Sequence, residues 1–160
     1  MDDLLVFLCV ITALGCGLNA GTFFTFSSFV MKALARLQPT QGLAAMQSIN
    51  IAAVTPAFMT ALFGTAVGCV AVAVWALVEW HDSFGPYLLA GGGLYLVGTI
   101  GLTIGYHVPR NDALASVEPE STDAARRWTH YVAEWTAWNH VRAASSLAAA
   151  AALTLALVVA

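Results

Sequence analysis

The sequence predicts an all-α integral membrane protein with one domain, residues 1–160, built as an up-down bundle of four helices. Composition is the first reason: 59% of the residues are hydrophobic and 9% are charged, whereas a soluble domain carries charge on about a quarter of its residues. The second reason is the absence of Asp, Glu, Lys and Arg from residues 4–31, 37–78, 83–109 and 143–160. Each of these stretches can hold a membrane-spanning helix, which takes roughly 17–25 residues.

The same composition excludes several classes of protein. A soluble enzyme would need more charge, and six Lys and Arg with a net charge of −3 leave no basic surface for a nucleic acid. The three cysteines lie within predicted spans and form no CxxC pair, which excludes a secreted disulfide scaffold and a zinc motif: Cys9, Cys16 and Cys69. We therefore expect the lipid bilayer as a partner and no nucleic acid.

The first span is expected over about residues 4–30. The chain begins without the basic residues of a signal peptide, so we expect this segment to remain as a helix. Asn19, near its middle, either hydrogen-bonds to a neighbouring helix or binds a ligand together with Phe26. Small residues recur at a spacing of four and favour close helix packing, including packing in a homo-oligomer: Ala13, Gly17 and Gly21.

The second and third spans are expected over about residues 50–78 and 86–107, and the second is expected to open near Thr55-Pro56, because proline is tolerated in the first turn of a helix. Asn50 begins the second span, as a helix cap or as a ligand-binding residue. Pro109 is expected to end the third helix, and Asn111 to close an Asx-type turn after it. Both spans contain small-residue faces that suit close packing: Gly64 and Gly68, and then Gly98, Gly101 and Gly105.

The fourth helix is expected to begin near Ser121 and to continue to the C-terminus. Residues 121–138 are polar and aromatic, and residues 139–160, the predicted span, are mostly Ala, Leu and Val. Forty residues of α-helix reach roughly 60 Å, about twice the thickness of the hydrocarbon core. The helix should therefore either project from the membrane or break near Trp138-Asn139.

Basic residues orient the bundle. They follow the first span and precede the fourth, while the N-terminus and the connection between spans two and three contain none: Lys32, Arg36, Arg110, Arg126 and Arg127. Because basic loops stay in the cytoplasm, we expect both termini outside the cytoplasm and a bacterial inner membrane as the location.

The segment 128–142 is the richest in chemically useful side chains. At 100° per residue, one arc about 100° wide holds Trp128, Tyr131, Trp135, Trp138, Asn139 and Arg142. His130 and Glu134 lie four residues apart on a neighbouring strip. An interfacial aromatic belt would explain the aromatic residues, but their gathering on one side with Asn and Arg favours a ligand pocket between helices.

Three histidines add a weaker alternative. His107 ends the third span on the membrane side where the fourth helix begins, so His107, His130 and His140 are expected to approach one another near one interface. Such a set would suit a haem or a metal ion, although no HxxxH or ExxH pattern supports it. The preferred interpretation has no metal and leaves the cofactor open.

Four groups of residues resemble those of the anthrone oxygenase-like membrane proteins. They are Gly21-Thr22-Phe23-Phe24-Thr25-Phe26-Ser27, Met46-Gln47-Ser48-Ile49-Asn50, Pro109-x-Asn111-x-x-Leu114 and Trp128-x-x-Tyr131-x-x-x-Trp135-x-x-Trp138-Asn139-x-x-Arg142. The resemblance spans nearly the whole chain. It implies four membrane helices and, as in the fungal members, oxidation of an anthrone to an anthraquinone without an organic cofactor.

That chemistry suggests roles for the candidate residues. The aromatic side chains would stack on flat rings. The base that removes a proton would be His107, His130 or Glu134. Hydrogen-bond donors would stabilise an enolate or a peroxide anion: Asn111, Asn139 and Arg142.

The leading hypothesis is a membrane oxygenase or oxidase that uses O₂ on a flat lipophilic phenolic, anthrone-like or quinone-like molecule. Two alternatives stay open. The chain is a non-catalytic membrane subunit that binds a lipophilic ligand, quinone or haem for a partner, or it is a purely structural bundle that packs into an oligomer through its glycine-rich faces.

Overall fold

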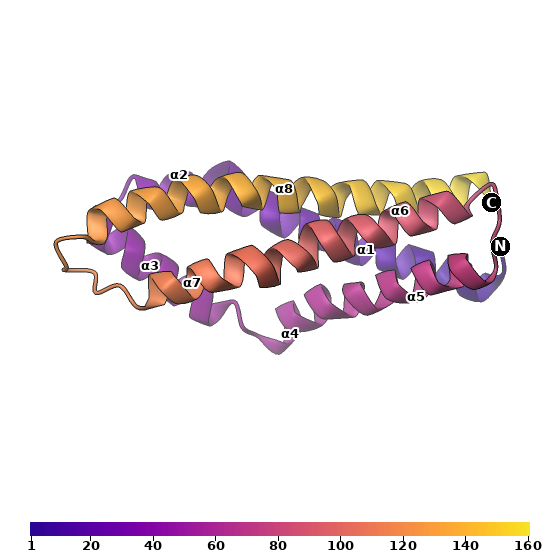
Figure 1. The fold of residues 1–160 in the computed structure, drawn as a ribbon, viewed down its shortest axis with the longest axis horizontal. Coiled ribbons are helices and arrows are strands. Elements are labelled where there is room, and N and C mark those ends of the chain that lie inside the picture. Colours follow the sequence, from indigo (N-terminus) through magenta and orange to yellow (C-terminus); the bar gives the residue numbers. More distant parts are fainter.

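The structure is a computed structural model that describes residues 1–160 and contains helices and no β-strands (Figure 1). Four helices are long and apolar enough to cross a membrane: Asp3–Ala35, Pro56–Val78, Gly85–Ala115 and Ala124–Val159. A fifth helix, α3 (Pro39–Ala52), lies between the first two in the chain. The predicted all-α class and the four membrane-capable helices are confirmed, so the chain is an integral membrane protein.

The first long helix consists of α1 (Asp3–Thr25), the π-helical segment η1 (Phe26–Val30) and α2 (Met31–Ala35). Asp2 caps it, since its Oδ1 accepts a hydrogen bond of 2.8 Å from the backbone N–H of Leu5. The helix runs five residues beyond the expected end at residue 30.

The second membrane helix opens at Thr55-Pro56, as expected, and residues 50–55 of the range 50–78 lie outside it. Residues 50–52 belong to α3, and the membrane helix consists of α4 (Pro56–Met59), η2 (Thr60–Gly64) and α5 (Thr65–Val78). Thr55 starts this helix because its Oγ1 accepts a hydrogen bond from Phe58 N (3.2 Å), and Pro56 needs no partner for a backbone N–H. Asn50 therefore lies in the last turn of α3 and is not a helix cap.

The third helix passes through Pro109, so the expected end at that residue is wrong. It consists of α6 (Gly85–Tyr95), η3 (Leu96–Gly101), η4 (Thr103–His107) and α7 (Val108–Ala115). A proline lacks the N–H that an α-helix uses and crowds the carbonyl four residues earlier. The wider π-helical turns of η4, directly before it, accommodate both effects. Asn111 consequently lies on a helix and not in an Asx-type turn.

The fourth helix, α8 (Ala124–Val159), is continuous over 36 residues. At 1.5 Å per residue it is about 54 Å long, well beyond a hydrocarbon core of about 30 Å. The helix does not break at Trp138-Asn139, and its projection from the membrane stays a prediction.

The helices form an up-down bundle. Figure 1 shows both termini and the α5–α6 connection at one end, and α2, α3, α7 and the start of α8 at the other. Along the bundle, α8 packs against α1 and α6, and α5 completes the ring by contacting α1 and α6.

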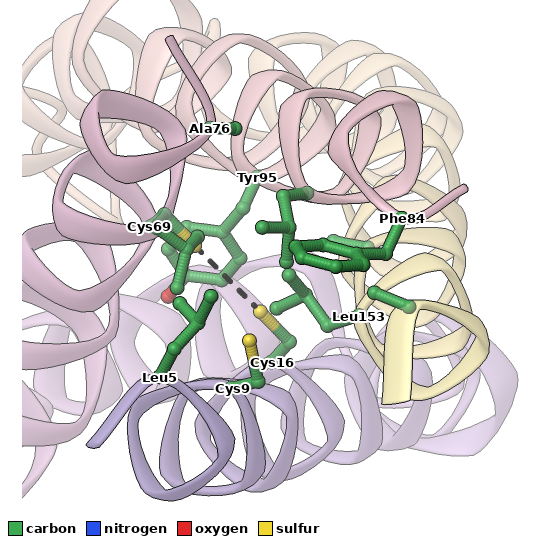
Figure 2. Close-up of a cluster of buried hydrophobic side chains, with 12 residues drawn as sticks. Leu5, Cys9, Cys16, Cys69, Ala76, Phe84, Tyr95 and Leu153 are labelled. Atoms are coloured by element: carbon green, nitrogen blue, oxygen red, sulfur yellow. Dashed lines mark hydrogen bonds between the residues drawn. The ribbon is translucent and has the colours of Figure 1, made fainter. Parts of the chain in front are cut away.

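A tightly packed core fills the end with the termini (Figure 2). Tyr95, Leu153 and Leu5 are almost fully buried there, and the thiols of Cys16 and Cys69 approach to 3.9 Å. The Tyr95 hydroxyl donates a 3.0 Å hydrogen bond to the carbonyl of Leu62. The three cysteines thus pack as small buried side chains, free of disulfides.

Only some of the expected small-residue faces mediate close packing. A side chain at Gly92 would meet the carbonyl oxygen of Cys69 at 2.9 Å, so α5 and α6 approach closely there. Gly17 and Gly21, by contrast, have no neighbour within 4 Å of a Cβ position, and the same holds for Gly105. Homo-oligomerisation through these open faces stays a prediction.

Candidate functional site

A cavity of about 170 Å³ lies inside the bundle, toward the end opposite the termini. Five helices line it with 17 residues, 11 of them hydrophobic. Apolar walls come from all parts of the chain: Phe23, Phe26, Met46, Ile49, Phe58, Met59, Leu62 and Trp135. Six of the predicted site residues reach it: Phe26, Asn50, His107, Asn111, Trp135 and Arg142.

Arg142 carries a buried positive charge into this cavity, with only 7% of the residue exposed. Its Nε and Nη2 donate hydrogen bonds of 3.1 and 2.6 Å to Asn139 Oδ1, and its Nη1 donates one of 3.1 Å to Thr103 Oγ1. None of the ion pairs in the structure involves Arg142. A buried cation without an acidic partner is costly, and two of its five N–H groups remain for a ligand.

Asn139 positions this arginine. It is fully buried, and its Nδ2 donates hydrogen bonds to the carbonyl of Phe23 (2.7 Å) and to Ser27 Oγ (2.6 Å). The Phe23 ring lies 3.9 Å from the guanidinium carbon of Arg142. The π-helical segment η1 and the end of α1 therefore hold the guanidinium by way of Asn139 and the Phe23 ring.

His107 contributes a hydrogen-bond acceptor, and it is 1% exposed. Its Nδ1 lies 3.1 Å from the carbonyl oxygen of Leu102. Since a carbonyl only accepts, Nδ1 carries the proton in the neutral ring, and Nε2 holds a lone pair. Nε2 is buried without a hydrogen-bond partner. The cavity therefore has an unoccupied basic nitrogen in its wall.

Trp135 lies between these two groups. Its ring is 5.2 Å from that of His107, edge to face, and 5.7 Å from the guanidinium carbon of Arg142. Asn111 Oδ1 fixes it by accepting hydrogen bonds from Trp135 Nε1 (3.0 Å) and from the Tyr131 hydroxyl (2.8 Å). A flat ligand on Trp135 would thus meet a base and a cation.

The other aromatic residues expected to form walls lie outside the cavity lining. Trp128 and Tyr131 are buried and stack at 5.9 Å in a neighbouring core, where Trp128 packs on Gly42. Trp138 is 42% exposed and contacts Tyr106 on the outside of the bundle. Three of the aromatic residues on the arc are buried, but only Trp135 lines the cavity.

Two of the predicted bases lie on the surface. The carboxylate of Glu134 is 3.4 Å from Arg110 Nε and 3.3 Å from His130 Nε2. The His130 side chain is 72% exposed. Both line a shallow surface hollow, not the cavity.

The expected approach of the three histidines is wrong. His130 and His140 are exposed on α8, whereas His107 is buried. No three His, Cys, Asp or Glu side chains come close enough to hold one metal ion. Asn19 also lies apart from the cavity lining. Its Nδ2 bridges the carbonyls of Gly15 (2.9 Å) and Ala61 (3.0 Å), which joins α1 to η2.

Sequence reasoning missed several residues that complete the site. Thr103 orients Arg142, Ser27 orients Asn139, and Phe58 lines the cavity. Thr103 follows Thr99 by four residues in an apolar span, a spacing that could have marked a polar helix face. Phe58 gives no such signal, since an apolar residue in a membrane helix is ordinary.

Comparison with known proteins adds an independent result. A family model described as anthrone oxygenase matches residues 57–152, three fifths of the chain. This range contains His107, Asn111, Trp135 and Arg142. Neither the curated proteins nor the solved structures give a match. The matched range covers the second, third and fourth membrane helices almost completely, and the chain belongs to the anthrone oxygenase family.

Proposed function

We propose that this protein is a membrane oxygenase that oxidises a flat lipophilic phenolic, anthrone-like or quinone-like molecule with O₂. The observation that carries the proposal is the pairing of an unpartnered buried base, His107 Nε2, with a buried cation, Arg142, that has no carboxylate. The family name supports the same reaction class. A purely structural bundle would be expected to satisfy both groups internally.

The reaction needs little from the protein beyond these two groups. His107 Nε2 removes a proton from a CH₂ that lies beside a carbonyl and between aromatic rings. The electron pair of that C–H bond moves into the ring system and leaves an enolate oxygen, which the Arg142 N–H groups stabilise. The deprotonated carbon reacts with O₂, a C–O bond forms, and the resulting peroxide anion takes the proton back from His107 Nε2. Loss of water then leaves a carbonyl, so substrate and O₂ give the quinone and H₂O.

The mainly apolar lining of the cavity strengthens this chemistry, because opposite charges attract more strongly where the surroundings screen them less. An uncharged substrate enters such a cavity more readily than its enolate does. Arg142 therefore contributes most after the proton has moved, which is where stabilisation raises the rate.

The test is oxygen consumption by the purified protein in lipid nanodiscs, with 1,8-dihydroxyanthrone as the probe. We expect His107→Gln to reduce the turnover by a factor of about 10²–10⁴, the range of a lost general base. His130→Gln is the matched control, because His130 is exposed outside the cavity, and it should keep turnover within twofold. Binding of the probe without any O₂ consumption by the wild-type protein would contradict the oxygenase and favour a non-catalytic ligand-binding subunit.

We also propose that the end of the bundle that holds the site faces the cytoplasm of a bacterial cell and that both termini lie on the other side of the inner membrane. Five of the six Lys and Arg belong to segments at the site end, and acidic residues without Lys or Arg occupy the other end. Alkaline phosphatase fused to the C-terminus should be active if this orientation is right, and inactive if it is reversed.

A further inference from the structure

The cavity is too small for a three-ring substrate. It measures about 170 Å³, close to the engineered cavity of about 150 Å³ that binds one benzene molecule. It therefore encloses one ring with its substituents, and two further rings of an anthrone-like molecule need space elsewhere. This step rests on the proposed function, which supplies the shape of the substrate.

A second hollow continues from the cavity. It is a groove of about 540 Å³ between α3 and α7, and four residues line both spaces: Asn50, Val54, Val108 and Asn111. Gln47 holds the two walls together, because its Nε2 donates hydrogen bonds of 2.9 Å to the carbonyls of Leu114 and Val117. The groove is thus a built extension of the cavity.

The lining of the groove suits a polycyclic phenol. Ile51 and Val54 expose 79% and 70% of their surface at its rim, and the amides of Asn50 and Asn111 lie where it joins the cavity. Asn50 Nδ2 is buried there without a hydrogen-bond partner. A flat ligand with ring carbonyl or hydroxyl oxygens would cover the apolar rim and accept that hydrogen bond.

We expect the mouth of the groove near the membrane surface. The second membrane helix, Pro56–Val78, has 23 residues and is about 34 Å long, close to the thickness of the hydrocarbon core. Its first residue therefore lies near one interface, and Val54 of the groove is two residues away. A lipophilic phenol, with an apolar ring system and polar oxygens, is enriched at that depth.

We propose that the groove between α3 and α7 is the port through which the substrate enters from the membrane surface and the outer subsite that holds its trailing rings. The leading ring enters the cavity beside Trp135, and Asn50 donates a hydrogen bond to an oxygen of the ring system. The groove therefore selects polycyclic over single-ring substrates.

The test compares two substitutions on α7. Ala115 lines the groove but not the cavity, and Ala115→Trp fills it. Ala113→Trp is the matched control, because Ala113 is also exposed on α7 but lines the hollow beside Glu134. Binding of 1,8-dihydroxyanthrone and of hydroquinone is measured by equilibrium dialysis without O₂, after size-exclusion chromatography has confirmed folding.

We expect Ala115→Trp to raise the Kd for 1,8-dihydroxyanthrone at least tenfold and to leave the Kd for hydroquinone within twofold. Ala113→Trp should leave both within twofold. The double variant Ile51→Trp/Ala115→Trp, with one bulky residue from each wall, should extend the loss. Unchanged binding of the three-ring probe in the double variant, or equal loss of both probes, would overturn the port.

The outcome separates the port from the oxygenase. Wild-type protein that binds the three-ring probe through the groove but consumes no O₂ supports the port and contradicts the oxygenase. If the wild-type protein consumes O₂ and the double variant does so with unchanged kinetics, the oxygenase is supported and the port is contradicted. Wild-type protein that binds neither probe overturns both proposals.

Discussion

The two ends of the bundle differ in how completely their polar groups are satisfied. At the end with the termini, Tyr95 donates to a backbone carbonyl and the surrounding side chains pack closely (Figure 2). At the other end, the cavity is lined by Arg142, which has no counter-ion, and by two of the four buried polar side-chain atoms that have no partner, His107 Nε2 and Asn50 Nδ2. The other two, Asn19 Oδ1 and Thr136 Oγ1, lie outside the cavity lining. The first end resembles an ordinary membrane core, whereas the second leaves costly groups free around a cavity.

The backbone shows the same division. Three of the four π-helical segments supply cavity residues: Phe26 in η1, Leu62 in η2, and Thr103 with His107 in η4. The core at the other end is built mainly from α1, α5, α6 and α8. A π-helical turn is less stable than an α-helical one and often occurs at functional sites. The comparison teaches that this bundle gives up local stability at the end that holds the cavity.

Removal of the buried charge should produce the largest effect. Arg142→Gln is expected to lower turnover about 10²–10³-fold, as the loss of an oxyanion-stabilising donor does. Its melting temperature in detergent should stay level or rise, because a buried cation without a carboxylate partner costs free energy of folding. Oxygen uptake and thermal unfolding measure the two quantities. A large fall in stability with unchanged turnover would break the comparison.

A cavity created by mutation in the core at the opposite end should lower stability and leave turnover unchanged. Leu153 is fully buried, and Leu153→Ala is expected to lower the free energy of unfolding by about 2–5 kcal/mol with turnover unchanged. Leu155→Ala, on the same helix and 47% exposed, is the matched control and should change stability little. Chemical denaturation in detergent micelles compares the pair. Loss of turnover in Leu153→Ala without unfolding would show that the two ends are coupled.

The support beneath Trp135 should show an intermediate effect. Asn111→Leu leaves the Tyr131 hydroxyl and Trp135 Nε1 without their acceptor, at a cost of about 1–3 kcal/mol for each buried group. Adding Tyr131→Phe removes one of these orphaned donors, so the double variant should regain part of the lost stability. A double-mutant cycle measured by thermal unfolding checks this coupling. Strict additivity of the two changes would contradict it.

The surface ion pair should show the smallest effect. The side chains of Arg110 and Glu134 are 38% and 39% exposed, and such pairs contribute about 0–1 kcal/mol. Glu134→Gln should therefore change stability by no more than this, lose that difference in high salt, and keep turnover within twofold. A large loss of turnover would restore Glu134 as the general base.

Much of the fold could be predicted because hydropathy is a local property. Four charge-free stretches mark the four membrane helices, and the arc on α8 correctly groups five buried side chains: Trp128, Tyr131, Trp135, Asn139 and Arg142. The error at Pro109 has a physical reason. Proline was expected to end the helix, but π-helical turns, which leave no pattern in the sequence, let the helix continue.

The choice among the candidate bases needed the tertiary structure. His107 and His130 look equally suitable in sequence, since each lies near Arg and aromatic residues. Only tertiary packing buries His107 of η4 against Trp135 of α8 and leaves His130 exposed.

The sequence alone determined that this chain is an all-α membrane bundle and which face of its last helix is buried, because composition and helical periodicity depend on neighbours in the chain. Tertiary structure alone decided that Asn50, His107 and Arg142 share one cavity. These residues are far apart in sequence, and only the approach of three helices leaves them around one space. The approach of these helices sets the burial, the nearby charges and the hydrogen-bond partners of each group. These in turn set the reactivity of the group.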